Sequence, residues 1–312
     1  MSNAVPGYFS GSQAVSPAAM LETRPMYWSV RRELWEHRSI YIAPLAVAGV
    51  AMLGFLASLV GLPKSMRELP GLDLAHQRVA LATPFAHSGM LLMLTGFVVG
   101  VFYCLDALHG ERRDRSILFW KSLPVSDLTT VLAKASIPYV VLPLFVFAFT
   151  FVLQLGMLFW SSVVLLLSGV GATAMWTRLP LFQMELGLLY GVTVVTLWLA
   201  PIYAWLLLVS GWARRAPFLW AVLPPAAIAI FETIAFHTSR FGYLLKDRLF
   251  GFAEDAFNLK GPDGAPIDAH FIPLSQFTPG KFLSSPGLWI GLVVAVAFLV
   301  AAVRLRRYRE PI

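Results

Sequence analysis

The sequence predicts an all-α integral membrane protein, and two observations decide this class. First, hydrophobic residues make up 58% of the 312-residue chain and charged residues only 13%, with a mean hydropathy of +0.70. A soluble domain carries about 25% charged residues. Second, several apolar stretches reach the roughly 20 residues that a helix needs to cross a hydrocarbon core about 30 Å thick. The apolar surface of this chain is therefore expected to face lipid.

Hydropathy divides the chain into six membrane-spanning helices. They run about Ile40–Leu62, Phe85–Leu105, Ile137–Trp160, Glu185–Ser210, Pro217–Phe236 and Leu288–Val303. The apolar segment Ser161–Pro180 is short for a span of its own. We interpret it as an extension of the third helix or as a re-entrant piece after it. Prolines inside the spans are expected to kink the helices at Pro138, Pro143, Pro201, Pro224 and Pro225.

The distribution of basic residues predicts that both termini are cytoplasmic. In that topology the inside segments hold 15 of the 24 basic residues, and the outside segments, which are longer in total, hold nine. We therefore expect a multi-pass protein of the bacterial inner (plasma) membrane. Its parts would be a cytoplasmic N-terminus (1–39), a transmembrane domain (40–303) with an inside loop (106–134) and an outside loop (237–286), and a cytoplasmic tail (304–312).

Two segments outside the spans have the pattern of amphipathic helices. In Met26–Arg38, an apolar face that includes Trp28 and Trp35 lies opposite a polar face of Arg32, Glu33 and Glu36. This pattern predicts an interfacial helix on the cytoplasmic leaflet. In the outside loop, helical spacing of apolar residues predicts a second amphipathic helix, with Phe241, Leu245, Leu249 and Phe252 on its apolar face. That helix would either cap a pathway or pack on the outer surface as a connector.

The inside loop between the second and third spans is dense in charge and then abruptly apolar. The run Ile117–Leu123 is bounded by Asp114 and Arg115 on one side and by Pro124 on the other. A short helix of this composition is apolar nearly all round, so it cannot face water on any side. Because its own spans can cover only one face, the remaining face is expected to meet another protein. Ser126 and Asp127 then mark the start of the third helix.

At this loop the chain resembles the ABC-2-type transporter permeases. Members of that family carry, after their second span, a Glu with basic residues, a short apolar helix, a Pro and a Ser. This chain has ERRDRSILFWKSLPVS at Glu111–Ser126. Six spans, an amphipathic helix before the first span and a long outer segment before the last span also fit the family's layout. The apolar segment Ser161–Pro180 departs from the family's simplest plan.

The resemblance implies a permease subunit of an ATP-driven exporter. In that family the short apolar helix is the coupling helix, which docks in a groove of a separate ATPase subunit. Two ATPase subunits and a second permease subunit would complete the transporter, and ATP and magnesium would bind on the ATPase. The residues that the resemblance assigns to coupling are Glu111, Arg112, Arg113, Asp114, Arg115, Ile117, Leu118, Phe119, Trp120, Lys121, Leu123 and Pro124.

The chain has no catalytic motif of its own. It lacks the phosphate-binding G-x-x-x-x-G-K-[ST] loop, HExxH and G-x-S-x-G, and its six histidines are scattered. We therefore expect no enzyme activity, no metal ligands and no cofactor on this chain. The single cysteine, Cys104, excludes an intramolecular disulfide. The net charge of +7 fits anionic lipid headgroups rather than nucleic acid.

Two acids, Glu185 and Glu232, fall within predicted spans and are candidates for a substrate pathway. Both lie toward the outer side in the predicted topology, where headgroups could equally accommodate them as structural residues. Two other function classes stay open at this point. One is a membrane assembly or scaffold protein without transport activity, and the other is an intramembrane enzyme.

Overall fold

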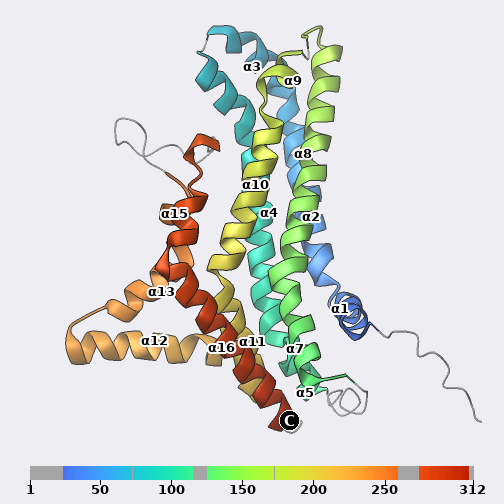
Figure 1. The fold of residues 1–312 in the computed structure, drawn as a ribbon. Coiled ribbons are helices and arrows are strands. Elements are labelled where there is room, and N and C mark those ends of the chain that lie inside the picture. Colours follow the sequence, from blue (N-terminus) through green and yellow to red (C-terminus); the bar gives the residue numbers. More distant parts are fainter. Residues whose placement is uncertain (1–23, 72, 115–124, 172, 259–273, 309–312) are drawn as a thin grey trace, which may run out of the picture.

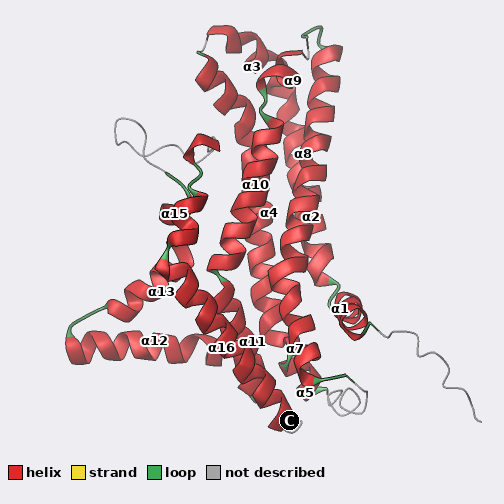
Figure 2. Ribbon diagram, in the orientation of Figure 1, coloured by secondary structure: helices red, strands yellow, loops and turns green. Residues whose placement is uncertain are grey.

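The computed structural model describes residues 24–71, 73–114, 125–171, 173–258 and 274–308 (Figure 1). The secondary structure is helical, with no strand among these residues (Figure 2). The elements are α1 (Pro25–Glu36), α2 (Ser39–Ser58), η1 (Leu59–Gly61), α3 (Leu62–Glu68), η2 (Leu69–Gly71), α4 (Leu74–Ala107), α5 (His109–Arg113), α7 (Asp127–Ser136), η3 (Ile137–Val141), α8 (Leu142–Leu167), α9 (Thr173–Arg178), α10 (Leu181–Trp198), α11 (Ala200–Trp212), α12 (Pro217–Phe236), α13 (Arg240–Phe250), α14 (Phe252–Ala256), η4 (Leu274–Gln276), α15 (Pro279–Ser284) and α16 (Pro286–Tyr308).

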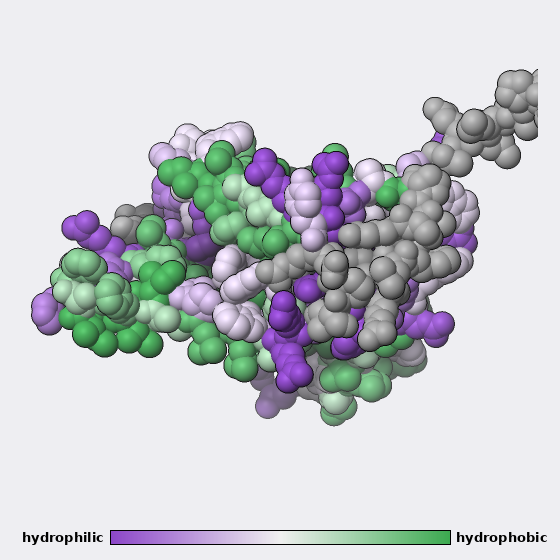
Figure 3. All heavy atoms as spheres, turned by 90° about the horizontal axis from the view of Figure 1, so that it is seen from below, coloured by the Kyte–Doolittle hydropathy of each residue, from purple (hydrophilic) through white to green (hydrophobic). Residues whose placement is uncertain are grey.

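The long helices form one bundle (Figure 1). Helices α2, α4, α8 and the α10–α11 pair run side by side, and α16 packs along α11 (Figure 1). The predicted six spans are confirmed to the extent that six described helices are long and apolar enough to cross a membrane. Helix α1, helix α5 and the C-terminal end of α16 lie at the same end of the bundle. Seen from that end, hydrophilic side chains are scattered over the face, with apolar patches between and around them (Figure 3).

The third predicted span is longer than hydropathy indicated. It begins at Asp127, with Ser126 as N-cap: the Ser126 hydroxyl accepts from the Thr129 N–H at 3.0 Å. The helix continues through a π-helical turn that contains Pro138, which has no N–H to donate, and runs on to Leu167. Gly169, with φ +66°, ends it. The apolar piece after residue 160 is therefore an extension of the third helix as far as Leu167, and the short α9 follows it.

The fourth predicted span consists of two consecutive helices. Helix α10 ends at Trp198 and α11 starts at Ala200, with Pro201 in its first turn. The kink that we expect at Pro201 is thus present as a break. The Trp198 carbonyl at this break accepts from the Arg248 guanidinium at 3.3 Å. Arg248 comes from α13 in the predicted outside loop, so α13 packs beside the break and does not extend beyond the end of the bundle.

Helix α12 has the bounds predicted for the fifth span but a different direction. It lies across the direction of the bundle helices and projects to one side, and α13 leads the chain back toward the bundle (Figure 1). Its apolar side chains are exposed nearly all round. Helix α12 is continuous through Pro224 and Pro225, so these prolines do not break it. Helix α12 packs mainly on α11 and α13, and Ala221 is its buried residue.

The predicted amphipathic helix before the first span is present as α1, and its polar face is turned inward. Glu33 is fully buried, whereas Tyr27, Trp28 and Trp35 are exposed. The Arg31 guanidinium lies over the Trp28 and Trp35 rings at 5.3 and 4.7 Å, so its stem covers the apolar face. Helix α1 therefore presents aromatic side chains outward and inserts Arg32 and Glu33 between other helices.

Candidate functional site

A network of buried ion pairs joins four parts of the chain at the end of the bundle that carries the C-terminus. Its core contains three carboxylates and three cationic side chains, and Glu36 pairs with Arg32 at its edge at 3.6 Å. Lys134 and Glu33 are 1% and 0% exposed, and Glu111 and Arg306 are 7% and 6% exposed. The members are Arg32 and Glu33 of α1, Glu111 of α5, Asp127 and Lys134 of α7, and Arg306 of α16.

Glu33 connects α1 to the rest of this network. Its Oε1 accepts from Lys134 Nζ at 2.8 Å and from Arg32 at 2.7 Å, and its Oε2 accepts from the Tyr103 hydroxyl at 2.8 Å. Both carboxylate oxygens are thus hydrogen-bonded, and two of the three donors are charged. A buried carboxylate is tolerated only under such pairing, because an unpaired charge in the interior is very costly.

Glu111 and Arg306 link the two ends of the loop that contains Ile117–Leu123. The Glu111 Oε1 accepts from Arg32 at 2.8 Å and lies 3.1 Å from Lys134 Nζ, and its Oε2 accepts from Arg306. The same guanidinium donates through Nε to Asp127 at 3.0 Å. Glu111 lies just before the loop and Asp127 just after it. One side chain of α16 therefore clamps both ends of the loop.

Arg112 fixes α5 to a different helix end. Its Nη1 donates to the Gly211 carbonyl at 2.8 Å and to the Ala213 carbonyl at 3.3 Å. These carbonyls belong to the C-terminal end of α11, where a helix has unpaired acceptors and a partial negative charge. His109 also contacts the Ala213 carbonyl, at 3.3 Å. Helix α5 is consequently held on one side by the charge network and on the other by α11.

The ion pairs of Glu33 lower the pKa of its carboxyl group. Burial by itself raises the pKa of the Glu33 carboxyl, but the charges and hydrogen bonds of Lys134 and Arg32 outweigh it and lower that pKa to about 2, from an ordinary value of 4.5. The unfolded chain therefore binds a proton at Glu33 at a higher pH than the folded chain does. The stability that Glu33 contributes is complete above pH 4.5 and is lost as the pH falls from there toward 2.

This lowered pKa predicts an acid-dependent difference between the wild type and Glu33→Gln. We expect the wild type to be the more stable by a constant margin above about pH 5. Below about pH 4.5 the margin should shrink by about 1.4 kcal/mol per pH unit, because only the wild type has this carboxyl to protonate. The measurement is the thermal midpoint of both proteins in one detergent between pH 7 and pH 3. A margin that stays constant to pH 3 contradicts the lowered pKa.

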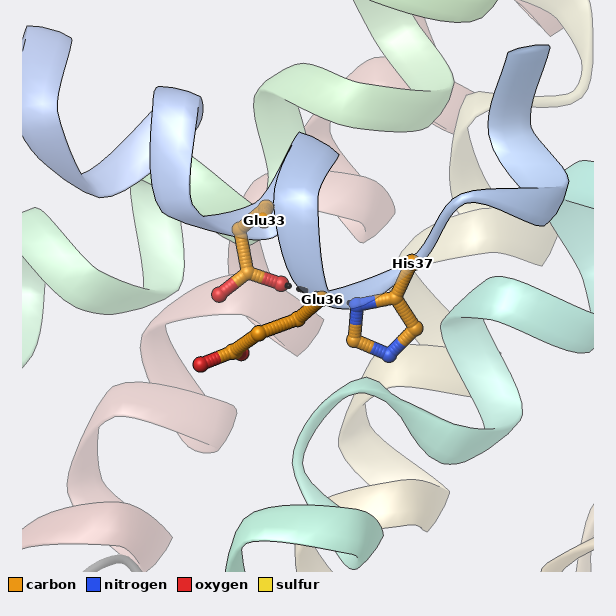
Figure 4. Close-up of side chains that lie close together, drawn as sticks. All are labelled: Glu33, Glu36 and His37. Atoms are coloured by element: carbon orange, nitrogen blue, oxygen red, sulfur yellow. Dashed lines mark ion pairs between the residues drawn. The ribbon is translucent and has the colours of Figure 1, made fainter.

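Glu33, Glu36 and His37 bring three metal-ligand atoms within 4.8 Å of one another. Figure 4 shows Glu33 and His37 turned toward each other, with Glu36 beside them. Their arrangement does not suit a metal ion, because the Glu33 carboxylate already holds Lys134 and Arg32 at 2.7–2.8 Å. A dication bound there would face two positive groups at close range. We therefore interpret the cluster as part of the charge network.

No family model, curated protein or solved structure matches the chain. The resemblance to ABC-2-type permeases thus rests on the residues from Glu111 to Ser126 and on the layout of the helices. Of the residues predicted to couple to an ATPase, the structure describes four. Glu111 and Arg112 are buried in the contacts above, whereas Arg113 and Asp114 are exposed and pair with each other at 3.0 Å. The others lie outside the described residues: Arg115, Ile117, Leu118, Phe119, Trp120, Lys121, Leu123 and Pro124.

The two acids considered for a substrate pathway lie far from the network and from each other. Glu232 caps the start of α13: its carboxylate accepts from the Phe241 N–H at 2.7 Å, the Arg240 N–H at 2.9 Å and the Thr238 hydroxyl at 2.8 Å. This geometry gives Glu232 a structural role at the α12–α13 corner. Glu185 is half-buried on α10, and its Oε2 is buried without a hydrogen-bond partner.

Sequence reasoning missed five members of the network as parts of a site, namely Arg32, Glu33, Asp127, Lys134 and Arg306. Arg32 and Glu33 were placed on a polar face, Asp127 at a helix start, and Lys134 and Arg306 among basic residues of the inside segments. One signal could have singled out Lys134. In Asp127–Ser136 it is the only basic residue, and one helical turn before it lies Thr130, with Val131 and Ala133 beside it. A lone cation on such a face requires a carboxylate partner.

Proposed function

We propose that this chain is the transmembrane permease subunit of an ATP-driven exporter of the ABC-2 type. It would couple a separate ATPase subunit to the movement of substrate across the bacterial inner membrane. The observation that carries the proposal is the Arg306 clamp: one buried guanidinium pairs with Glu111 before the loop and with Asp127 after it. The loop between them contains the apolar run that the sequence predicts to dock on a partner.

Through the network, a displacement of that loop would be transmitted to the helices of the bundle. Glu111 is tied to α1 through Arg32, to α7 through Lys134 and to α16 through Arg306. Because charge-assisted hydrogen bonds fix both distance and direction, these helices move together with the loop ends more readily than they separate. When ATP closes the pair of ATPase subunits, a force on the loop would reach α1, α7 and α16 at once. ATP and magnesium would bind on the partner, and this chain would supply the spans.

The proposal predicts a definite topology. In a Cys104→Ala background, Arg115→Cys should resist a membrane-impermeant maleimide in intact cells and should react after permeabilisation. Lys64→Cys, exposed on α3 at the opposite end of the bundle (Figure 1), should react in intact cells. The physical reason is the excess of basic residues on the predicted inside. Reaction of position 115 in intact cells would contradict the topology and remove the loop from the side where an ATPase resides.

The functional test is ATP hydrolysis by the purified complex. We expect the chain, tagged and extracted from its native membrane, to bring with it a polypeptide that carries a phosphate-binding loop. The ATPase activity of this complex should rise when its substrate is added. A chain that purifies without any ATPase, and whose host transports normally after its deletion, favours a scaffold protein instead.

A further inference from the structure

The outer face of α1, which is turned away from the bundle, carries cations and aromatic rings. Tyr27, Trp28 and Trp35 are 56, 57 and 65% exposed, and Arg24 and Arg31 are exposed as well. Arg24 and Arg31 are seven residues apart, as are Trp28 and Trp35, so each pair returns to nearly the same side of the helix after two turns. Arginines and tryptophans therefore alternate along the outer face.

This face has a positive charge that the chain does not neutralise. Both acids of α1 are engaged by Arg32, which pairs with the fully buried Glu33 at 2.7 Å and with Glu36 at 3.6 Å. Neither Arg24 nor Arg31 pairs with a carboxylate in the part of the chain that the structure describes. Because the ion pairs of Glu33 fix the rotation of α1 about its axis, they also fix the outward direction of these arginines.

The outer face lies where the apolar surface of the bundle begins. Helix α2 follows α1 and starts one of the six segments long and apolar enough to cross a membrane. Ile42 and Leu45, in its first two turns, are 51 and 57% exposed. Figure 1 shows α1 nearly end-on beside the start of α2, so α1 lies across the direction of the bundle helices. Arg38, at the junction of α1 and α2, is a further exposed cation.

Position at a membrane interface does not by itself select a lipid headgroup, but charge does. Tryptophan and tyrosine rings are enriched at membrane interfaces because they are amphipathic, whatever the headgroup. Arginine, in contrast, forms bidentate hydrogen bonds with phosphate, and an anionic leaflet attracts each basic residue at its surface. The Arg31 guanidinium lies over the Trp28 and Trp35 rings, so it is held at the level of the rings. A lipid phosphate there would supply the counter-charge that the chain lacks.

We propose that the outer face of α1 binds the headgroups of anionic phospholipids, with Arg24, Arg31 and Arg38 on the phosphates and the tryptophan rings in the interface beside them. This inference goes beyond the proposed function and does not depend on it, because a transporter and a scaffold protein would use such a surface alike. The experiment uses the chain without an ATPase, so its failure is distinguishable from failure of the ATPase test.

The experiment compares the purified chain in nanodiscs of phosphatidylcholine with the chain in nanodiscs of phosphatidylcholine mixed with phosphatidylglycerol. The readout is hydrogen–deuterium exchange of the backbone amides of Pro25–Glu36. We expect exchange to be slower in the mixed nanodiscs by about fivefold or more, because each basic residue at an anionic surface shifts the equilibrium by about that factor. The difference should shrink as salt is added, since salt screens exposed charges.

Three variants separate the contribution of charge from that of the rings. Arg24→Gln/Arg31→Gln/Arg38→Gln should exchange at the same rate in both kinds of nanodisc. Replacement of the same arginines by Lys keeps the charge and should keep most of the difference. Trp28→Ala/Trp35→Ala should exchange faster in both kinds of nanodisc and retain the ratio between them, because the rings enter the interface whatever the headgroup.

Lys64→Gln/Arg67→Gln/Arg78→Gln is the matched control. These three cations are exposed on α3 and near the start of α4, at the opposite end of the bundle (Figure 1). Their removal lowers the net charge by the same amount, so α1 should respond to phosphatidylglycerol as in the wild type. Inorganic phosphate added to phosphatidylcholine nanodiscs should leave the exchange of α1 unchanged.

Several results would overturn the proposal. Equal exchange of wild-type α1 in the two kinds of nanodisc would mean that its outer face does not distinguish anionic lipid. A difference that persists in the Gln variant of the three arginines, or that disappears in the matched control, would place its origin outside this face. Slowing by inorganic phosphate alone would mean that the arginines bind a free anion. Protection that rises with protein concentration in detergent, without a response to phosphatidylglycerol, would assign the face to a second copy of the chain.

Discussion

Replacement of Lys134 by Met should destabilise the protein by about 3–5 kcal/mol, the largest effect that we expect from any single change in the network. Lys134 is 1% exposed and lies 2.8 Å from Glu33 and 3.1 Å from Glu111. Without Lys134, the buried carboxylates of Glu33 and Glu111 lose the most deeply buried of their cationic partners. Arg32 is then the cation that pairs with both of them. The measurement is the thermal midpoint in detergent, together with the yield of monodisperse protein after gel filtration.

Lys281→Met is the matched control. Lys281 also pairs with a carboxylate, Asp255, at 3.6 Å, but its side chain is 58% exposed. Exposed pairs contribute roughly 0–1 kcal/mol, so this variant should resemble the wild type. In addition, Glu33→Gln combined with Lys134→Met restores neutrality and should recover part of the loss. If the double variant shows the sum of both single losses, the ion pair is not the origin of the effect.

Truncation of Phe119 and Trp120 to Ala should weaken docking of the ATPase by one to two powers of ten. Both residues belong to the apolar run of the loop that the sequence predicts to be cytoplasmic and to be only partly covered by its own spans. Burial of a large apolar side chain contributes about 1.5–3 kcal/mol, and about 1.4 kcal/mol is a factor of ten in affinity. The measurement is the dissociation constant between the ATPase and the permease in one detergent.

The control for this pair is Phe182→Ala, which removes an aromatic side chain that is 78% exposed at the opposite end of the bundle. It should leave docking unchanged. Arg113→Ala should weaken docking of the ATPase more at low salt than at high salt, because an exposed charge acts mainly by steering the encounter of the two proteins. If Phe119→Ala/Trp120→Ala retains its ATPase and its coupled transport, the assignment of a coupling helix is wrong and a scaffold role gains support.

The spans could be predicted because membrane burial requires only length and hydropathy. The predicted Pro217–Phe236 matches α12 at both ends, and the start at Ser126 and Asp127 is visible as an N-cap pattern. The break at Pro201 follows from the missing proline N–H. The direction of α12 could not be predicted, because a helix that is apolar all round carries no information about which face packs.

The network could not be predicted, because its partners are far apart in the sequence. Glu33 and Lys134 are separated by 101 residues, and Glu111 and Arg306 by 195. An amphipathic pattern shows that α1 has a polar face but not which way that face points. Its charged side chains can be stabilised either by water or by opposite charges inside the protein. Likewise, the positive-inside rule counts Arg306 as one cation among several. Only the fold shows that it pairs with both ends of the loop.

The central claim is that the loop between Glu111 and Asp127 connects this chain to an ATPase, and replacement of the loop tests it most directly. Residues 115–124 are exchanged for a Gly/Ser linker of equal length, which leaves Glu111, Asp127 and Arg306 in place. Wild type and variant are tagged, extracted from the native membrane and analysed for co-purifying proteins and for thermal midpoint. The account predicts equal midpoints, with a phosphate-binding-loop ATPase bound to the wild type and lost from the variant. Retention of the same ATPase by the variant would contradict it.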